Sequence, residues 1–305
     1  MIKIDYEENR TLLEETYVNK LFSTKFGSGK SAKTVEEKFN DLKNTAPFNK
    51  IFHNISFENL ISSKPDKLKE LIRNIKSNFS DRQITELNEV FKWYKFQPII
   101  SSFFEEELQV RTCSFCNIHF VNEYKENDKS FKNEFTLDHY YDKATYPYLA
   151  LSFYNLIPSC YTCNSKLKKN EEFKNLAPSS EYFDFNEKVK FKLYLDKSCK
   201  NLHIKDKEDI EIELKEYYSN DYDKYIEVFK LNERYKAHKD IVYDMITKAE
   251  LYPESRLKEL QDLTGIPFQQ IKKDIFNLID EKEDLSKKPF SKLIKDISEE
   301  LGLTK

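Results

Sequence analysis

Two short cysteine motifs decide how this sequence is interpreted: residues 113–116 read CSFC, and residues 160–163 read CYTC. Two such pairs offer four thiolates, a ligand set that binds Zn²⁺ tetrahedrally. Two disulfides or a redox pair are the alternatives, but cytosolic thiols stay reduced, and a redox role leaves the second pair unexplained. The fifth cysteine, Cys199, is expected to be a packed thiol. We expect a structural zinc ion held by Cys113, Cys116, Cys160 and Cys163.

The composition narrows the class of protein. Only 4 of the 305 residues are glycine, which argues against a glycine-rich dinucleotide-binding fold. The formal net charge is −3, so contact with nucleic acid has to come from a local patch or from a partner. No run of about 18 apolar residues occurs, and the first residues, MIKIDYEE, lack the pattern of a secretory signal. We expect a cytoplasmic protein without a membrane span.

Polar residues are spaced along the segment that joins and follows the cysteine pairs, where residues 135–166 read FTLDHYYDKATYPYLALSFYNLIPSCYTCNSK. A zinc ion bound by four thiolates has no open position, so it cannot act as a Lewis acid. A second, hard cation such as Mg²⁺ or Mn²⁺ prefers oxygen ligands, which the Asp138 carboxylate and the Asn164 carbonyl can supply. If the DH pair lies on a strand, Asp138 and His139 point to opposite faces.

The segment from about 110 to 172 resembles the HNH, or ββα-metal, endonucleases, and most closely the zinc-ribbon branch that includes phage endonuclease VII. The resemblance implies that Asp138 is a metal ligand and that His139 is the general base. It also implies that Asn155 braces the loop and that Asn164 is the second metal ligand, where other members carry the last histidine. The four cysteines then hold the structural zinc.

The resemblance implies hydrolysis of a phosphodiester bond. Neutral His139 accepts a proton from the attacking water, because imidazole titrates near working pH. The metal ion stabilises the leaving 3′ oxygen, which leaves 5′-phosphate and 3′-hydroxyl ends. DNA is the favoured substrate, while RNA, for example tRNA, cut by the same site and a non-catalytic zinc-ribbon binding protein remain alternatives. Three lysines on the following helix either meet substrate phosphates or form a solvated face: Lys166, Lys168 and Lys169.

Each of these residues also has a structural interpretation. His139 can pack beside the zinc ribbon, Asn155 can bond nearby backbone, and Asn164 can cap the helix that starts after Cys163. His119, three residues after Cys116, is expected to be a packed or surface histidine.

The whole chain is expected to be α+β and mostly helical. We predict four regions: an N-terminal helical region (1–108), the nuclease core with its zinc knuckles (109–172), a small β appendage (173–218) and a C-terminal helical region (219–305). The β appendage is predicted because apolar residues alternate over 189–195 and 210–214. The motifs LDH and NLIPSC and the helical flanks also resemble the HNH subunits of Septu-type bacterial anti-phage systems. Those subunits work beside an ATPase. That resemblance implies a protein partner, an ATPase.

The chain itself is not expected to bind ATP. The stretch GSGKS at 27–31 looks like the end of a Walker A loop, but the glycine that the motif requires is replaced by Thr24. The preceding residues 11–22 have helical apolar spacing, whereas the motif needs a strand.

Overall fold

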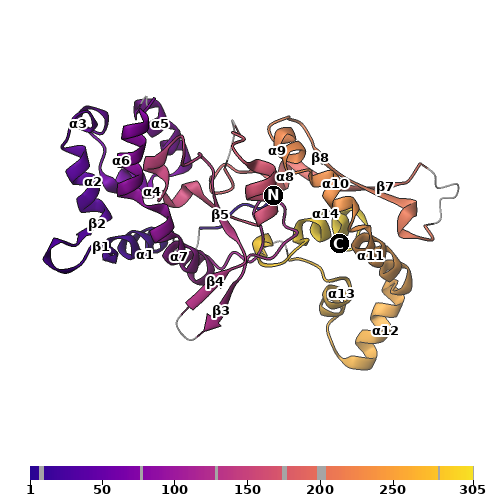
Figure 1. Cartoon of the computed structure of the whole chain (residues 1–305). Coiled ribbons are helices and arrows are strands. Elements are labelled where there is room, and N and C mark those ends of the chain that lie inside the picture. Colours follow the sequence, from indigo (N-terminus) through magenta and orange to yellow (C-terminus); the bar gives the residue numbers. More distant parts are fainter. Residues whose placement is uncertain are drawn as a thin grey trace. The chain divides into compact units, whose positions relative to one another are not determined.

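The computed structural model is an α+β protein with many short helices and small two-stranded sheets (Figure 1). It describes residues 1–6, 10–75, 78–127, 130–173, 177–197, 204–280 and 282–304. Cys199 lies outside the described residues. The chain divides into two compact units. The unit called N-terminal here comprises Lys3–Ser114 and His119–Phe183, and the unit called C-terminal comprises Met1–Ile2, Phe115–Ile118 and Asp184–Lys305.

Helices make up most of the first part of the N-terminal unit. Capping boxes start three of them, at Thr34, Ser56 and Ser80, and each box satisfies backbone groups that the first turn leaves free. A proline at its first position opens another of these helices, at Pro65. The helices are α1 (Arg10–Ser23), α2 (Val35–Lys43), α3 (Phe48–Ile51), α4 (Phe57–Ser62), α5 (Pro65–Ile75), α6 (Asp81–Phe91) and α7 (Trp93–Phe103).

Aromatic side chains fill the core between these helices. Phe39 on α2 has its ring edge-on to Phe52 at 5.4 Å, and it also contacts Phe57 and Phe91. All four side chains are buried. Such rings bury large areas and prefer edge-to-face or offset geometry, so they supply much of the hydrophobic stabilisation of a helical unit.

Three hairpins complete the N-terminal unit. The strands β1 (Lys25–Phe26) and β2 (Lys33–Thr34) form the first, and β3 (Glu123–Asn127) and β4 (Ser130–Asn133) form the second. The third joins β5 (Thr136–His139) to β6 (Leu156–Ser159) in antiparallel register. Short helical turns lie around them: η2 (Gly29–Ser31), η3 (Phe104–Leu108), η4 (Pro147–Leu149), η5 (Phe153–Asn155) and η6 (Thr162–Lys168).

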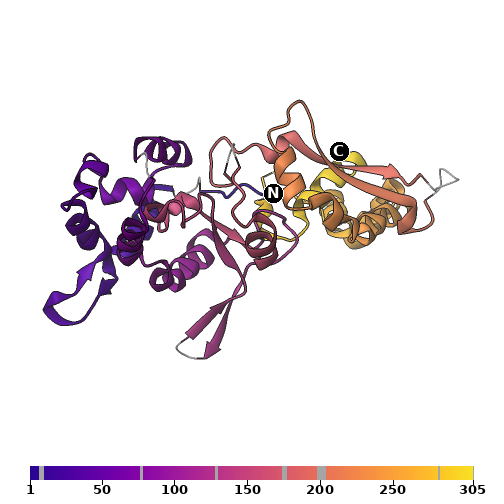
Figure 2. The same ribbon diagram turned by 45° about the horizontal axis from the view of Figure 1, so that its top comes forward.

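The C-terminal unit contains one long hairpin and seven α-helices among the described residues. Strands β7 (Val189–Leu195) and β8 (Ile210–Glu216) pair along their whole length, which confirms the β-structure expected from the alternating pattern. This hairpin belongs to the same compact unit as the helices that follow it, and α14 packs along β7 (Figure 2). The helices are α8 (Phe185–Lys188), α9 (Asp223–Val228), α10 (Leu231–Lys236), α11 (Lys239–Leu251), α12 (Glu254–Thr264), α13 (Phe268–Phe276) and α14 (Ser291–Glu300), and a short turn, η7 (Lys207–Asp209), precedes β8 while another, η8 (Leu285–Lys287), precedes α14.

A buried ion pair lies within α14, on the side that contacts β7. Lys292 Nζ lies 2.9 Å from Asp296 Oδ2, and both side chains are almost fully buried. Asp296 also accepts a hydrogen bond from the backbone N–H of Phe191. Burial lowers the pKa of Lys292. In the part of the chain that the structure describes, no helix is long and apolar enough to cross a membrane.

Candidate functional site

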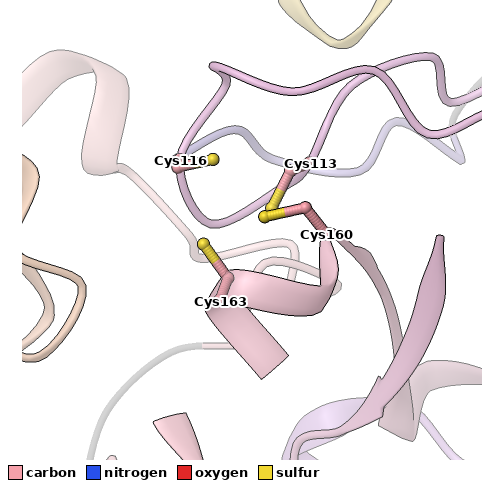
Figure 3. Close-up of side chains that lie close together, drawn as sticks. All are labelled: Cys113, Cys116, Cys160 and Cys163. Carbon is pink, nitrogen blue, oxygen red and sulfur yellow. The ribbon is translucent and has the colours of Figure 1, made fainter. Parts of the chain in front are cut away.

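The four cysteines of the two motifs come together. Their sulfur atoms all lie within 4.8 Å of one another, and all four side chains are buried. Figure 3 shows the four sulfur atoms turned toward a common centre. None of the four forms a disulfide, so the two-disulfide alternative is wrong. Four buried thiols at this spacing can hold a metal ion such as zinc, for which zinc–sulfur bonds of about 2.3 Å are typical.

Backbone hydrogen bonds shape both knuckles. The N–H of Cys113 donates to His119 O at 2.9 Å, which closes the first loop, and the N–H of Asn164 donates to Cys160 O at 3.1 Å, which opens the turn η6. The N–H of Ser114 donates to Pro158 O at 3.0 Å and so ties the first knuckle to β6. His119 itself is exposed and is not among the grouped ligands.

Asn117, which sequence reasoning missed, fixes the tip of the first knuckle. Its backbone has a φ of 54°, in the left-handed region that asparagine tolerates better than most residues. Its side-chain amide donates to Leu285 O at 3.2 Å and Lys288 O at 3.1 Å, and its Oδ1 accepts from Ser291 Oγ and Lys292 N. The side chain is fully buried. All four hydrogen-bonding positions of this amide are therefore satisfied.

The hairpin β5–β6 and the turn η6 hold the other predicted residues. Asp138 pairs with Ile157 across the hairpin, and His139 pairs with Leu156. Adjacent strand residues point to opposite faces, and the two side chains have different neighbours, as described next. Both side chains are buried, with Asp138 2% and His139 6% exposed.

His139 is held in one orientation by two contacts. Its Nε2 lies 3.0 Å from Ala150 O, and its ring lies edge-on to the Trp93 ring with 4.5 Å between centroids. A carbonyl oxygen only accepts, so Nε2 carries the proton and Nδ1 keeps its lone pair. Trp93 lies at the start of α7, far from His139 in the sequence, and sequence reasoning missed it.

His139 is neutral at physiological pH. Its pKa is lowered to about 3, mainly by burial; the positive charge of Lys143 acts in the same direction, and the hydrogen bond to Ala150 O opposes both. A neutral imidazole with a free lone pair can accept a proton, which is what a general base requires.

Asp138 lies in an unusual electrostatic environment. Lys168 Nζ is 3.1 Å from Asp138 Oδ2, and each of these side chains is about 97% buried or more. Apart from this ion pair, Oδ2 has no hydrogen-bond partner among the described residues. Burial raises the pKa of Asp138 to about 6, while the Lys168 ammonium acts in the opposite direction.

Lys168 therefore differs from its predicted neighbours on the same turn. The sequence suggested three lysines that face phosphate or solvent, and only Lys166 and Lys169 are exposed. Lys168 is 2% exposed and donates a hydrogen bond to His139 O at 3.1 Å. Lys168 is therefore not part of a solvated lysine face, because the widened turn directs this side chain toward β5.

Asn155 braces the loop between β5 and β6. Its amide donates to Tyr141 O at 3.0 Å and Leu149 O at 3.1 Å, and its Oδ1 accepts from Tyr141 N at 2.7 Å. The side chain is fully buried. These bonds hold the segment that carries Ala150, the partner of His139.

Asn164 points back toward the hairpin. Its Nδ2 donates to Thr136 Oγ1 at 2.9 Å, which leaves the carbonyl oxygen Oδ1 as the group able to bind a cation. The turn η6 begins at Thr162, before Asn164, so this residue does not cap a helix that starts after Cys163. That structural alternative is wrong.

No protein-family model matches the chain, and no curated protein and no solved structure matches it.

Proposed function

We propose that this chain is a metal-dependent HNH-type endonuclease that hydrolyses phosphodiester bonds in DNA. One observation carries the proposal: a neutral histidine, fixed at Nε2 by Ala150 O, lies next in sequence to a buried carboxylate whose Oδ2 lacks a hydrogen-bond partner among the described residues. Both groups stand on a hairpin that runs directly into the four-cysteine cluster.

The chain's own residues would divide the work as follows. Nδ1 of His139 accepts a proton from the attacking water, and Ala150 and Trp93 keep the ring from turning. Asn155 holds the loop in place and so holds Ala150. Removing the base should cost on the order of 10²–10⁴ in rate.

A divalent cation would be held on the Asp138 side of the hairpin. Oδ2 of Asp138 is buried and has no hydrogen-bond partner among the described residues. A carboxylate oxygen is the hard ligand that Mg²⁺ or Mn²⁺ prefers, and Asn164 Oδ1 would be the second ligand. When bound, such an ion stabilises negative charge on the phosphate and on the leaving oxygen. The zinc held by the four thiolates would have no open position and would serve structure alone.

A lysine cluster in the N-terminal unit supports a nucleic-acid substrate. Three ammonium groups lie over the ring of Phe26: Lys95 at 4.0 Å, Lys38 at 4.5 Å and Lys92 at 6.0 Å. Lys92 pairs with Glu89, but among the described residues no carboxylate lies within 4.0 Å of Lys38 or Lys95. Burial and the neighbouring Lys92 lower the pKa of Lys38. Local positive charge in a chain of net charge −3 is the electrostatic feature that phosphate binding needs.

We further propose that the chain works with a protein partner, the ATPase of an anti-phage system. A few lysines give weak binding to nucleic acid at physiological salt, on the order of 10⁻⁴–10⁻⁶ M. A partner would then raise the rate by presenting substrate that the chain alone binds weakly. Tight binding of DNA by the purified chain alone at physiological salt would contradict this part of the proposal.

The function is tested by incubating the purified, zinc-loaded chain with supercoiled plasmid and Mg²⁺ or Mn²⁺. We expect nicking or linearisation by the wild-type chain and by His119→Ala, which removes an exposed histidine near the same knuckle. The same assay with His139→Ala, or without added Mg²⁺ and Mn²⁺, should give no cleavage. Cleavage by His139→Ala at the wild-type rate would overturn the proposal.

Two other outcomes assign the site differently. Cleavage of tRNA but not of plasmid, lost in His139→Ala, would identify the substrate as RNA. Absence of cleavage on both nucleic acids, with and without co-purified protein, would favour a non-catalytic zinc-ribbon binding protein.

A further inference from the structure

Lys168 is the least expected residue of the candidate site. A lysine that is 2% exposed lies 3.1 Å from a carboxylate oxygen that is itself buried, and it donates a hydrogen bond to the backbone oxygen of the adjacent residue, His139. Burying a charged lysine is costly unless a partner compensates, so its position is specified by Asp138 and by the His139 carbonyl.

The shape of η6 explains how Lys168 reaches this place. The N–H of Lys169 donates to Asn164 O at 3.1 Å, a bond between residues five apart, so the turn is wider than that of an α-helix. Turns closed by a bond between residues five apart are rare in proteins. Where they occur, they often lie at functional sites. Lys169 at the end of the turn has a φ of 48°, which directs the chain away just after Lys168.

We infer that the Lys168 ammonium occupies the position of the divalent cation beside Asp138, and that a metal ion binds this carboxylate only after displacing it. The inference rests on the proposed function, because it concerns the same carboxylate. An ammonium at 3.1 Å and a divalent cation at about 2.1 Å both require the same oxygen face, and their like charges repel at that range. Lys168 thus keeps the carboxylate charged and the metal side of the site closed until a cation competes successfully.

The alternative is a purely structural pair in which Lys168 neutralises Asp138 and has no effect on metal binding. The two explanations predict opposite changes in metal affinity when Lys168 is replaced. Competition predicts that removing the ammonium strengthens metal binding, whereas a structural pair predicts weaker binding, because the carboxylate would lose its support.

The test is a titration of the zinc-loaded chain with Mn²⁺ in the absence of nucleic acid, with free Mn²⁺ measured by electron paramagnetic resonance. Lys168→Met should bind Mn²⁺ at least about ten-fold more tightly than the wild type. Lys168→Arg keeps the positive charge and should stay as weak as the wild type. Lys166→Met removes an exposed lysine from the same turn and should not change the affinity. Asp138→Asn, combined with each variant, should abolish the difference.

Several outcomes would overturn the inference: equal or weaker Mn²⁺ binding by Lys168→Met, a difference that survives Asp138→Asn, or no Mn²⁺ binding in any variant. Zinc content and circular dichroism establish that each variant is folded. If Lys168→Met does not fold, Lys168→Gln removes the charge, keeps a polar head group, and carries the same expectation.

The inference and the proposed function can fail separately. Tighter Mn²⁺ binding by Lys168→Met together with no cleavage of any nucleic acid would leave the inference standing and remove the nuclease. Cleavage that depends on His139, together with an unchanged Mn²⁺ affinity in Lys168→Met, would leave the nuclease standing and remove the inference.

Discussion

The four-cysteine cluster and the Asp138–His139 site lie on neighbouring parts of one segment but are built in opposite ways. The cluster consists of four identical, buried ligands turned toward one centre, and a single ion would satisfy all of them. The other site combines a carboxylate, an ammonium and a neutral imidazole, and it keeps one acceptor without a hydrogen-bond partner among the described residues. A closed ligand set stabilises a fold, whereas a set with spare valences can exchange ligands and carry out chemistry.

Loss of the zinc ligand set should have the largest effect. Structural zinc contributes about 10 kcal/mol or more in small zinc domains, so Cys163→Ser should release the metal and lower the midpoint of thermal unfolding by more than about 10 °C. Zinc release measured with a colorimetric chelator and a thermal melt check this. Cys199→Ser is the control and should retain the wild-type zinc content. Full zinc occupancy in Cys163→Ser would contradict the account.

Substitution of the two buried asparagines should affect the two sites independently. Asn117→Gly removes the side chain at a position where glycine tolerates the positive φ, and Asn155→Ala removes the brace of the β5–β6 loop. Each should cost about 2–3 kcal/mol, because several buried backbone groups lose their partners. We expect Asn117→Gly to lose zinc more readily in a chelator titration and Asn155→Ala to lose cleavage activity at unchanged zinc content. The opposite pairing of effects would show that the two sites are not supported independently.

The sequence predicts those parts of the site that depend on local patterns, and it does not predict those that depend on contacts between remote residues. The cysteine pairs and the alternating apolar residues of β7 and β8 are local patterns, so the metal cluster and the hairpin could be predicted. Trp93 and Asn117 could not, because each acts through contacts with residues remote in the sequence. The burial of Lys168 depends on one extra residue in a turn, which no hydrophobic period reveals.

The buried histidine should make stability depend on pH. Its pKa is lowered from 6.5 to about 3 in the folded chain, so between these values the unfolded chain binds the extra proton, and stability falls as pH decreases below 6.5. At pH 5 the free energy of unfolding is lower by about 2 kcal/mol. This pH lies about 1.5 units below 6.5, and each unit corresponds to about 1.36 kcal/mol.

Urea unfolding of the wild type and of His139→Gln at pH 7 and pH 5 measures this loss. Asp138, whose pKa is raised to about 6, contributes in the opposite direction in both proteins, so the difference between them reports on His139. Identical pH dependence in the two proteins would show that the imidazole is not buried in its neutral form.

The smallest expected effect is on binding of nucleic acid. The double change Lys38→Gln and Lys95→Gln should reduce the slope of log affinity against log salt concentration by about 2 for duplex DNA, since each phosphate contact contributes about 0.9. Fluorescence anisotropy at low ionic strength, with His139→Ala as the background to prevent cleavage, measures the slope. The control pair Lys50→Gln and Lys67→Gln has the same change in charge on exposed lysines elsewhere in this unit. An equal reduction in the control would mean that net charge, not this cluster, sets the slope.

The measurement that tests the central claim most directly is chemical rescue of the base. His139→Gly leaves space beside Trp93, and added imidazole can enter it and accept the proton in place of the missing side chain. The account predicts that imidazole raises the plasmid cleavage rate of His139→Gly in a concentration-dependent way and leaves Asp138→Asn inactive. Cleavage by His139→Gly at the wild-type rate without imidazole would contradict it.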